Sequence, residues 1–324
     1  MAHPRDDKLV TVFGGSGFIG RHVVRALVKR GWRVRVAVRR PDLAFFLQPI
    51  GAVGQIMPVQ ANLRDRASVE RAIAGADAVV NAVGILAEGG KQKFSTLHAE
   101  GAKLVAEAAK AAGVSSLVHI SAIGADAESP ARYAQTKAKG EENVLAAYPD
   151  AVIVRPSIVF GPEDGFFNRF GAMAAMSPII PLVGADTLFQ PVFVGDVAEA
   201  VARGVEGALK PGAVYELGGP EVKTFRECIE QMLDVIDRKR VIVSLPFGLA
   251  RFQARFVQWL PNPPLTVDQV DMLKAPNIVS KAALSDGRTL AGLGIEPRTM
   301  AAILPTYLER FRPQGQFTRS KTTA

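Results

Sequence analysis

The chain has little cysteine and little histidine, which excludes disulfide-built and metal-built scaffolds. One cysteine, Cys228, occurs among 324 residues, so an internal disulfide framework cannot form. The apolar pattern around it, Phe225 to Leu233, predicts that the thiol is buried on a helix. The four histidines, at positions 3, 22, 98 and 119, lack the spacing of metal ligands, so we predict no metal site.

Long apolar runs are also missing. The longest, Phe170 to Ala185, is too short to cross a bilayer comfortably and is interrupted by Pro178 and Pro181. The first eight residues lack the apolar region of a signal peptide and contain two aspartates, which transit peptides avoid. We therefore expect no transmembrane helix and no targeting segment.

The chain is rich in apolar residues and carries a net positive charge. Hydrophobic residues make up 48% of it, enough for one large core or for a main domain with a smaller one. The net charge of +8 favours acidic partners, such as phosphorylated ligands or an anionic membrane surface. The basic residues are spread along the chain without a nucleic-acid-binding motif, so we do not expect nucleic acid as a partner.

A glycine-rich stretch near the start predicts a dinucleotide site. A β-branched run ends in Phe13-Gly14-Gly15-Ser16-Gly17-Phe18-Ile19-Gly20, and a helical pattern follows. We expect Gly14 to take the dihedral angles of a tight turn, Gly17 to let the backbone approach a pyrophosphate and Gly20 to let helix and strand pack closely. The phosphates would then meet the N-terminus of the helix. Because the spacing differs from G-x-G-x-x-G, a plain glycine turn is the alternative.

The next strand pattern ends in Arg39 and bears on the choice of nicotinamide cofactor. At about twenty residues past the glycines, an acidic side chain holds the adenosine ribose hydroxyls in NAD-binding proteins. A guanidinium at this place suits a 2′-phosphate instead, which favours NADP(H). The alternative is an ordinary solvated charge at a strand end.

Alternating strand and helix patterns predict a Rossmann-like, doubly wound parallel sheet. Buried strand patterns at 54–59, 77–84 and 116–121 are separated by helical patterns, one of them at 96–112. Small residues at 82–84 leave room for a flat ligand at a strand end.

The expected organisation is an NADP(H)-binding domain over 1–160 and a smaller C-terminal α/β domain over 161–311. A sheet-like segment around 192–197 is expected to return from the second domain to the first sheet. The residues from 312 to 324 are polar, basic and without periodicity, which predicts a flexible tail.

Three residues form a candidate catalytic group. Ser121 ends a buried strand, and Tyr133 and Lys137 follow at a four-residue spacing that places both on one helix face. A neighbouring ammonium favours the phenolate of a tyrosine, which suits proton exchange with a carbonyl. Ser121 would hydrogen-bond the substrate oxygen, and Lys137 could also hold the nicotinamide ribose. The group is either active or vestigial.

Taken together, these segments resemble the extended and atypical branch of the short-chain dehydrogenase/reductase superfamily. The resemblance rests on the glycine loop, Ser121, Tyr133, Lys137, the Arg155-Pro156 pair and the stretch Val192 to Ala198. It implies that Pro156 and Ile158 line the nicotinamide. The predicted cofactor site therefore comprises Gly14, Ser16, Gly17, Phe18, Ile19, Gly20, Arg39, Asn62, Leu63, Ala82, Val83, Gly84, Ser121, Tyr133, Lys137, Pro156 and Ile158.

Within the superfamily the chain is most similar to the NADPH-binding accessory subunits of respiratory complex I, the NADH:quinone oxidoreductase. The similarity lies in 13–21, 81–84, 131–141 and 189–198. It implies tightly bound NADP(H), other complex I subunits as partners, and a non-catalytic role at the junction of the peripheral and membrane arms. With no transit peptide, it implies a bacterial version on the cytoplasmic side of the inner membrane. The alternative is a free-standing NADPH-dependent reductase or a nucleotide-sugar epimerase that uses Ser121, Tyr133 and Lys137.

A late amphipathic segment, Pro246 to Leu260, leaves two interpretations open. Its apolar face combines Leu249, Phe252, Phe256 and Leu260. We expect this face to pack on its own domain. The alternative is that this helix and the basic tail contact a partner subunit or an anionic membrane surface, because aromatic and arginine side chains suit both.

Overall fold

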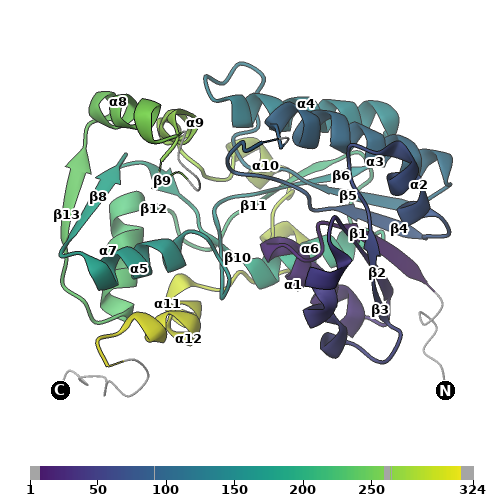
Figure 1. The fold of residues 1–324 in the computed structure, drawn as a ribbon, viewed down its shortest axis with the longest axis horizontal. Helices are drawn as coiled ribbons and strands as arrows, with labels where there is room; N and C mark the ends of the chain where they lie inside the picture. Colours follow the sequence, from purple (N-terminus) through teal and green to yellow (C-terminus); the bar gives the residue numbers. More distant parts are fainter. Residues whose placement is uncertain (1–7, 91, 259–262, 264, 315–324) are drawn as a thin grey trace. The chain divides into compact units, whose positions relative to one another are not determined.

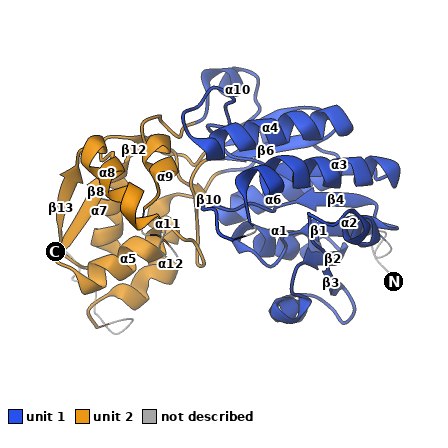
Figure 2. Ribbon diagram, turned by 45° about the horizontal axis from the view of Figure 1, so that its top comes forward, with its two compact units in different colours: residues 1–156, 194–217, 279–296 blue, residues 157–193, 218–278, 297–324 orange. Residues whose placement is uncertain are grey.

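The computed structural model describes residues 8–90, 92–258, 263 and 265–314, and it divides the chain into two compact units (Figure 2). Unit 1 falls within 1–156, 194–217 and 279–296, and unit 2 within 157–193, 218–278 and 297–324. The chain therefore crosses from one unit to the other after residues 156, 193, 217, 278 and 296.

Unit 1 is built on a seven-stranded parallel sheet with the strand order β11-β6-β5-β4-β1-β2-β3 (Figure 1). Its strands are β1 (Leu9–Phe13), β2 (Arg33–Val38), β3 (Ile56–Gln60), β4 (Ala78–Asn81), β5 (Ser116–Ile120), β6 (Val152–Pro156) and β11 (Val214–Leu217). The central strands are rich in valine and buried along their length, as strands covered on both faces require. The predicted doubly wound sheet is confirmed.

Helices cover both faces of this sheet. In Figure 1, α2 (Arg66–Ile73), α3 (Gly101–Ala111) and α4 (Arg132–Ala147) lie on one side and α1 (Phe18–Lys29) and α6 (Val194–Val205) on the other. Helices α1 and α6 pack against each other, as do α3 and α4. Shorter elements of unit 1 are η1 (Pro41–Ile50), η2 (Ser95–Glu100), α10 (Lys281–Ser285) and η3 (Ala291–Leu293).

One core of unit 1 lies between the sheet and α2, α3 and α4. Strand residues Phe13, Val79, Leu117 and Ile153 meet helix residues that are mostly small, such as Ala106. Small side chains on α3 let the helix pack close to the sheet. Because α4 packs on α3, this packing also sets how far the side chains of α4 lie from the strands.

Two segments differ from the sequence prediction. The sheet-like segment 192–197 is a strand only at Val192–Phe193, and residues from Val194 onward form α6. Valines in this segment resemble a strand pattern, but Val194, Val197, Val201 and Val205 recur at helical spacing and are buried on one helix face. The helix expected over 96–112 begins with a π-helical turn, η2, before α3.

Unit 2 consists of helices around three two-stranded sheets, β10-β7, β12-β9 and β13-β8. Its elements are β7 (Val159–Phe160), α5 (Phe167–Met176), β8 (Ile179–Val183), β9 (Leu188–Phe189), β10 (Val192–Phe193), β12 (Lys223–Thr224), α7 (Phe225–Val235), β13 (Val241–Leu245), α8 (Phe247–Val257), α9 (Val267–Met272), α11 (Met300–Ile303), α12 (Pro305–Leu308) and η4 (Glu309–Phe311).

The core of unit 2 contains a cluster of aromatic rings. Rings of Phe166, Phe167, Phe189 and Phe225 contact one another at centroid separations between 4.9 and 6.4 Å. Cys228 is buried in the same core on α7, as predicted, and burial raises the pKa of its thiol to about 12. The thiol is therefore protonated at neutral pH and packs as a small apolar side chain.

The amphipathic helix α8 is oriented opposite to our expectation. Ala250 and Ala254 face inward, whereas Leu249, Phe252 and Phe256 are 47%, 61% and 68% exposed. The inference that this apolar face packs on its own domain is wrong, because the two alanines let α8 lie on α9 by its other side. Leu260 and the tail beyond residue 314 lie outside the described residues. In the part of the chain that the structure describes, no helix is long and apolar enough to span a bilayer.

Candidate functional site

The glycine loop between β1 and α1 has the backbone geometry of a phosphate cradle. Gly14 has a φ of +75°, which side chains disfavour, and its N–H donates to the Ala37 carbonyl at 3.0 Å. Gly17 donates back to the Gly14 carbonyl at 2.9 Å. A Cβ on Gly20 would lie 2.2 Å from that same carbonyl oxygen, so only glycine fits there. The loop thus folds tightly over the start of α1.

The first turn of α1 carries the other residues predicted in this loop. Phe18 and Ile19 are its first two residues, and Gly17 caps it without a side-chain hydrogen bond. Arg21 donates to the backbone carbonyls of Ser16 and Gly17 and so holds the loop in place. The first N–H groups of the helix therefore point out of the loop without an intrahelical partner.

The loop lies at the point where the strand order of the sheet reverses. Strand β1 pairs with β2 on one side and with β4 on the other. A Cβ on Gly14 would lie 3.0 Å from the carbonyl oxygen of Ala82, so the segment after β4 borders the glycine loop. Ala82, Val83 and Gly84 thus sit at the carboxyl ends of the strands, where open α/β sheets bind their ligands.

Lys137 lies beside Gly84 and reaches the end of β5, directly before Ser121. Lys137 is 4% exposed, and its ammonium donates to the Ile120 carbonyl at 3.1 Å. The same ammonium lies close to Gly84, because a Cβ built on Gly84 would be 3.5 Å from it. Burial lowers the pKa of Lys137 to about 8, and the carboxylate of Glu141 counters part of that shift. Ser121 is also 4% exposed, and its hydroxyl has no hydrogen-bond partner among the described residues. Such a hydroxyl fits a site that a ligand completes.

Tyr133 lies on the same face of α4 as Lys137, as their spacing predicted. The Lys137 ammonium is 6.0 Å from the centroid of the Tyr133 ring, and the tyrosine is 9% exposed. Phe94 and His98 contact the ring edge-on at 5.8 and 5.3 Å. The structure therefore places Tyr133 beside Lys137, and Lys137 at the end of β5, which Ser121 follows in the chain.

His98 is a site residue that the sequence analysis did not single out. Its Nε2 accepts from the Ile85 N–H at 3.1 Å, so its protonated Nδ1 faces the Thr136 hydroxyl at 3.2 Å. Burial, with the charge of Lys137, lowers the pKa of His98 to about 3. The neutral ring thus ties the loop after β4 to the helix of Tyr133. Its position in a π-helical turn has no sequence signature.

His119 and Asn81 form a second buried polar pair that was not expected. They are register partners on β5 and β4, and both are almost fully buried. Within the described residues, neither ring nitrogen of His119 nor the side-chain nitrogen of Asn81 has a hydrogen-bond partner. Burial lowers the pKa of His119 to about 3, with the charge of Lys137 contributing. Both histidines near Lys137 are therefore uncharged at neutral pH.

Arg39 stands exposed just after β2, and it makes no hydrogen bond or ion pair with any other residue that the structure describes. Its neighbour Arg40 is engaged, because its guanidinium lies 2.7 Å from the carboxylate of Asp42. Of the two arginines that follow β2, Arg39 is thus the one whose guanidinium is available to a phosphate, as the sequence predicted.

The remaining predicted residues shape the surroundings or lie apart. The side-chain oxygen of Asn62 accepts from the Arg64 N–H at 3.2 Å within the turn after β3, and Leu63 is buried. Pro156 ends β6 in unit 1, whereas Ile158 belongs to unit 2. A place for Ile158 at the nicotinamide stays a prediction.

The geometry of unit 1 fits a dinucleotide. The loop supplies backbone N–H groups for a pyrophosphate, the small residues after β4 leave a flat surface, and an unpartnered hydroxyl and a buried ammonium stand beyond them. A group held at this place would run along the carboxyl edge of the sheet from Arg39 to Lys137.

Comparison with known proteins agrees with this geometry. An NAD(P)H-binding family matches residues 14–163. The mitochondrial NADH dehydrogenase (ubiquinone) 1 alpha subcomplex subunit 9 of Arabidopsis thaliana is 33% identical over 320 residues, which cover 95% of this chain and 79% of that protein. The subunit of the same name from Dictyostelium discoideum is 30% identical over 95% of this chain and 86% of its own length.

Solved structures show the same fold. A crystal structure of an NADPH-dependent quinone oxidoreductase from Escherichia coli, complexed with NADPH, has a TM-score of 0.71 at 21% identity and covers 90% of this chain and 97% of its own.

Proposed function

The chain belongs to the family of NADH dehydrogenase (ubiquinone) 1 alpha subcomplex subunit 9 proteins, and from this we propose that it is a non-catalytic accessory subunit of a respiratory NADH:quinone oxidoreductase that binds NADP(H). The observation that carries the proposal is the length of the match, which includes unit 2 as well as the nucleotide-binding unit. Its role is to stabilise the junction between the peripheral and membrane arms. The complex we propose is a bacterial one, with this chain on the cytoplasmic side of the membrane.

NADP(H) is the cofactor we propose over NAD(H). An exposed, unengaged Arg39 at the end of β2 supports it, because a guanidinium binds a 2′-phosphate through paired charged hydrogen bonds. When bound, a nicotinamide cofactor supplies a hydride donor or acceptor. In an accessory subunit the same cofactor would instead stabilise the native state by mass action.

The residues of unit 1 that would hold the cofactor have separate tasks. The N–H groups of Ser16, Phe18 and Ile19 would bind the pyrophosphate, and Ala82 to Gly84 would lie under the adenosine and ribose. The ammonium of Lys137 would hold the nicotinamide ribose, and the Ser121 hydroxyl would complete the polar contacts there. Gly14 and Gly20 would act only on the loop geometry.

We further propose that α8 contacts an anionic membrane surface at this junction. Leu249, Phe252 and Phe256 form an exposed apolar face, and the rings of Phe252 and Phe256 contact each other at 5.2 Å. The exposed Arg255 suits anionic headgroups, and the net charge of +8 has the matching sign. The basic tail over 312–324 is the other predicted membrane contact.

The accessory role is tested by extracting native membranes with a mild detergent and separating them on a native gel. The chain should migrate with the band that oxidises NADH, and deletion of its gene should reduce the amount of the assembled complex. Migration as a free monomer, with the complex unaffected by the deletion, would contradict the proposal.

A free-standing reductase or epimerase is the second candidate, because Tyr133 lies beside Lys137, Lys137 reaches the end of β5, and the Ser121 hydroxyl that follows has no partner among the described residues. In that case Tyr133 would exchange a proton with the substrate oxygen, Lys137 would favour its phenolate and Ser121 would orient the carbonyl. Turnover of NADPH with a panel of ketones, quinones and nucleotide sugars would favour this candidate if Tyr133→Phe abolishes it.

A further inference from the structure

His98 joins two backbone segments that border the nucleotide site in unit 1. Its side chain, on η2, is almost fully buried. The Ile85 N–H, in the loop after β4, donates to its Nε2 atom at 3.1 Å, and its Nδ1 atom lies 3.2 Å from the Thr136 hydroxyl on α4. That hydroxyl donates onward to the Tyr133 carbonyl at 3.0 Å. The three hydrogen bonds form one chain from the loop to the first turns of α4.

The direction of this chain leaves the ring of His98 a single tautomer. A backbone N–H can only donate, so Nε2 carries the lone pair and Nδ1 carries the proton. The Thr136 hydrogen is given to a carbonyl, so the hydroxyl oxygen is free to accept that proton's hydrogen bond. The ring therefore offers one acceptor and one donor, at the fixed separation that a planar aromatic ring imposes.

Packing holds the ring in this orientation. Phe94 stacks on it at a centroid separation of 5.3 Å, with 25° between the ring planes, and Tyr133 contacts it edge-on at 5.3 Å. The backbone of His98 is fixed as closely, because a Cβ built on Gly140 of α4 would lie 2.1 Å from the His98 carbonyl oxygen. A ring enclosed in this way keeps both of its hydrogen bonds.

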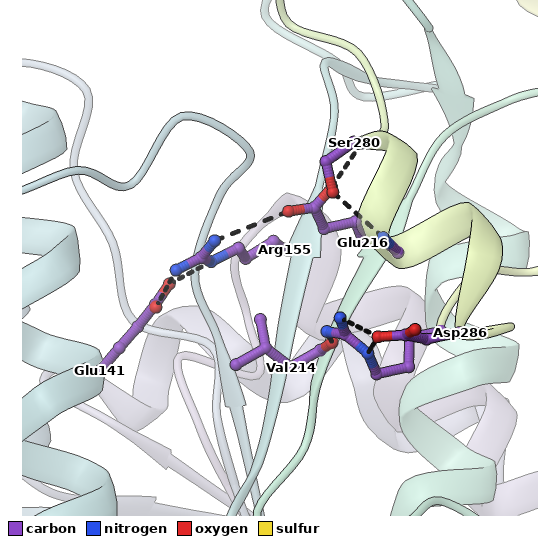
Figure 3. Close-up of polar contacts among 8 residues, drawn as sticks. Glu141, Arg155, Val214, Glu216, Ser280 and Asp286 are labelled. Atoms are coloured by element: carbon purple, nitrogen blue, oxygen red, sulfur yellow. Dashed lines mark hydrogen bonds and ion pairs between the residues drawn. The ribbon is translucent and has the colours of Figure 1, made fainter.

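Helix α4 is itself anchored to the sheet of unit 1. Arg155 on β6 donates from Nε and Nη2 to the two carboxylate oxygens of Glu141 on α4, at 2.9 and 2.6 Å (Figure 3). One helical turn earlier, the Lys137 ammonium donates to the Ile120 carbonyl at the end of β5. Because α4 is tied to two strands, the loop after β4 is the segment whose position depends on His98.

Gly84 is the loop residue that this arrangement places, since it directly precedes Ile85. A Cβ built on Gly84 would lie 3.5 Å from the Lys137 ammonium and 3.9 Å from Nε2 of His98. Gly84 is exposed, whereas Lys137 and His98 are buried beside it. An exposed backbone next to the ammonium marks the nicotinamide end of the proposed site, because Lys137 is the group that would hold the nicotinamide ribose.

We propose that His98 is a positioning residue for the nicotinamide half of NADP(H), because its ring holds the backbone of Gly84 at a fixed place relative to Lys137. The proposal rests on the proposed NADP(H) site of unit 1. The adenosine half of the ligand, which the glycine loop and Arg39 would bind, does not depend on this contact. His98 thus acts on one half of the ligand, whereas a ring that only fills space would act on the whole site.

The test compares wild type with His98→Gln, His98→Asn and Asn143→Ala. The amide oxygen of glutamine reaches the position of Nε2 and can still accept from the Ile85 N–H, whereas asparagine reaches only the position of Nδ1 and leaves that N–H without its acceptor. Asn143→Ala is the matched control, because the Asn143 side chain joins α4 to η2 by a different hydrogen bond, to the Ala99 carbonyl at 3.3 Å.

Two ligands are titrated by calorimetry, NADPH and adenosine 2′,5′-bisphosphate, which represents the adenosine half, and each protein's melting temperature is recorded. His98→Asn should bind NADPH about five- to tenfold more weakly, the effect of about one hydrogen bond, and should bind the bisphosphate as wild type does. His98→Gln should recover most of the NADPH affinity. Asn143→Ala should lower the melting temperature and leave the ratio of the two affinities unchanged.

Equal losses for both ligands in His98→Asn, no loss at all, or the same selective loss in His98→Gln would overturn the positioning role. Failure of the folded wild-type protein to bind NADPH is a different result, because it would overturn the proposed function and with it this inference. Should His98→Asn not fold, Thr136→Val decides the question, since it removes the other end of the same chain and keeps the ring. It should weaken NADPH alone, and equal losses for both ligands would contradict the proposal.

Discussion

Gly20 faces the backbone of Gly14 so closely that a Cβ on Gly20 would lie 2.2 Å from the Gly14 carbonyl oxygen. That oxygen also accepts the Gly17 N–H, so the contact fixes the loop at its narrowest point. The start of α1 and the turn that precedes it are therefore one rigid unit, and the nucleotide site depends on a position that would not itself contact the ligand.

The variant Gly20→Ala should push α1 away from the loop. We expect the free energy of unfolding to fall by about 1–3 kcal/mol, as at other overpacked positions. The affinity for NADPH should fall by a larger fraction of its wild-type value than the free energy of unfolding does. Urea denaturation and fluorescence titration measure the two. Gly89→Ala is the control, since a Cβ there meets no atom within 4 Å. Equal NADPH affinity in both variants would contradict a role for this contact in binding.

The variant Arg39→Gln should lower the affinity for NADPH and leave that for NADH unchanged. Hydrogen bonds to a charged group contribute about 1.5–3 kcal/mol, which corresponds to about ten- to a hundredfold in the dissociation constant. Arg40→Gln is the matched control, because that guanidinium is engaged by Asp42. Equal losses for both cofactors would show that Arg39 does not read the 2′-phosphate.

The variant His119→Leu should change how stability depends on pH. The pKa of His119 is about 3 in the folded protein and about 6.5 in the unfolded chain, so the unfolded chain binds more protons between these values. Stability is therefore full above pH 6.5 and is lost as the pH falls toward 3. The free energy of unfolding of the variant, relative to that of wild type, should therefore be about 2 kcal/mol higher at pH 5 than at pH 7.5. Parallel stability curves for the two proteins would contradict the buried neutral ring.

The double variant Phe252→Glu with Phe256→Glu should abolish binding to anionic vesicles while the fold is retained, because both side chains are more than half exposed. Sedimentation with vesicles containing phosphatidylglycerol measures the binding, and vesicles of neutral lipid provide the reference. Leu284→Glu, at a residue on α10 that is 60% exposed, is the control for a charge placed elsewhere. Unchanged sedimentation of the double variant would remove α8 from the proposed membrane contact.

The sequence was sufficient where a local pattern has one structural solution. Valine-rich strands such as β1 and β4, with helices between them, specify a parallel sheet. Gly14 and Gly20 predict the tight loop between β1 and α1. The four-residue spacing of Tyr133 and Lys137 placed both on one face of α4.

Other features depend on partners that sequence spacing does not reveal. An amphipathic pattern identifies the apolar face of α8 but not whether anything covers it, and Ala250 and Ala254 proved to be the packing side. His98 acts through a hydrogen bond to Ile85 that exists only in the folded chain. Arg155 meets Glu216 because β11 pairs with β6, a long-range choice of neighbour.

The accessory role is tested most directly by purifying a tagged copy of this chain from gently solubilised native membranes and identifying the proteins and the nucleotide that co-purify with it. We expect the subunits of the NADH:quinone oxidoreductase and close to one molecule of NADP(H) per chain, released only on denaturation. Recovery of the chain alone, with a cofactor that exchanges freely and turns over with a carbonyl substrate, would contradict the accessory role and identify an independent reductase.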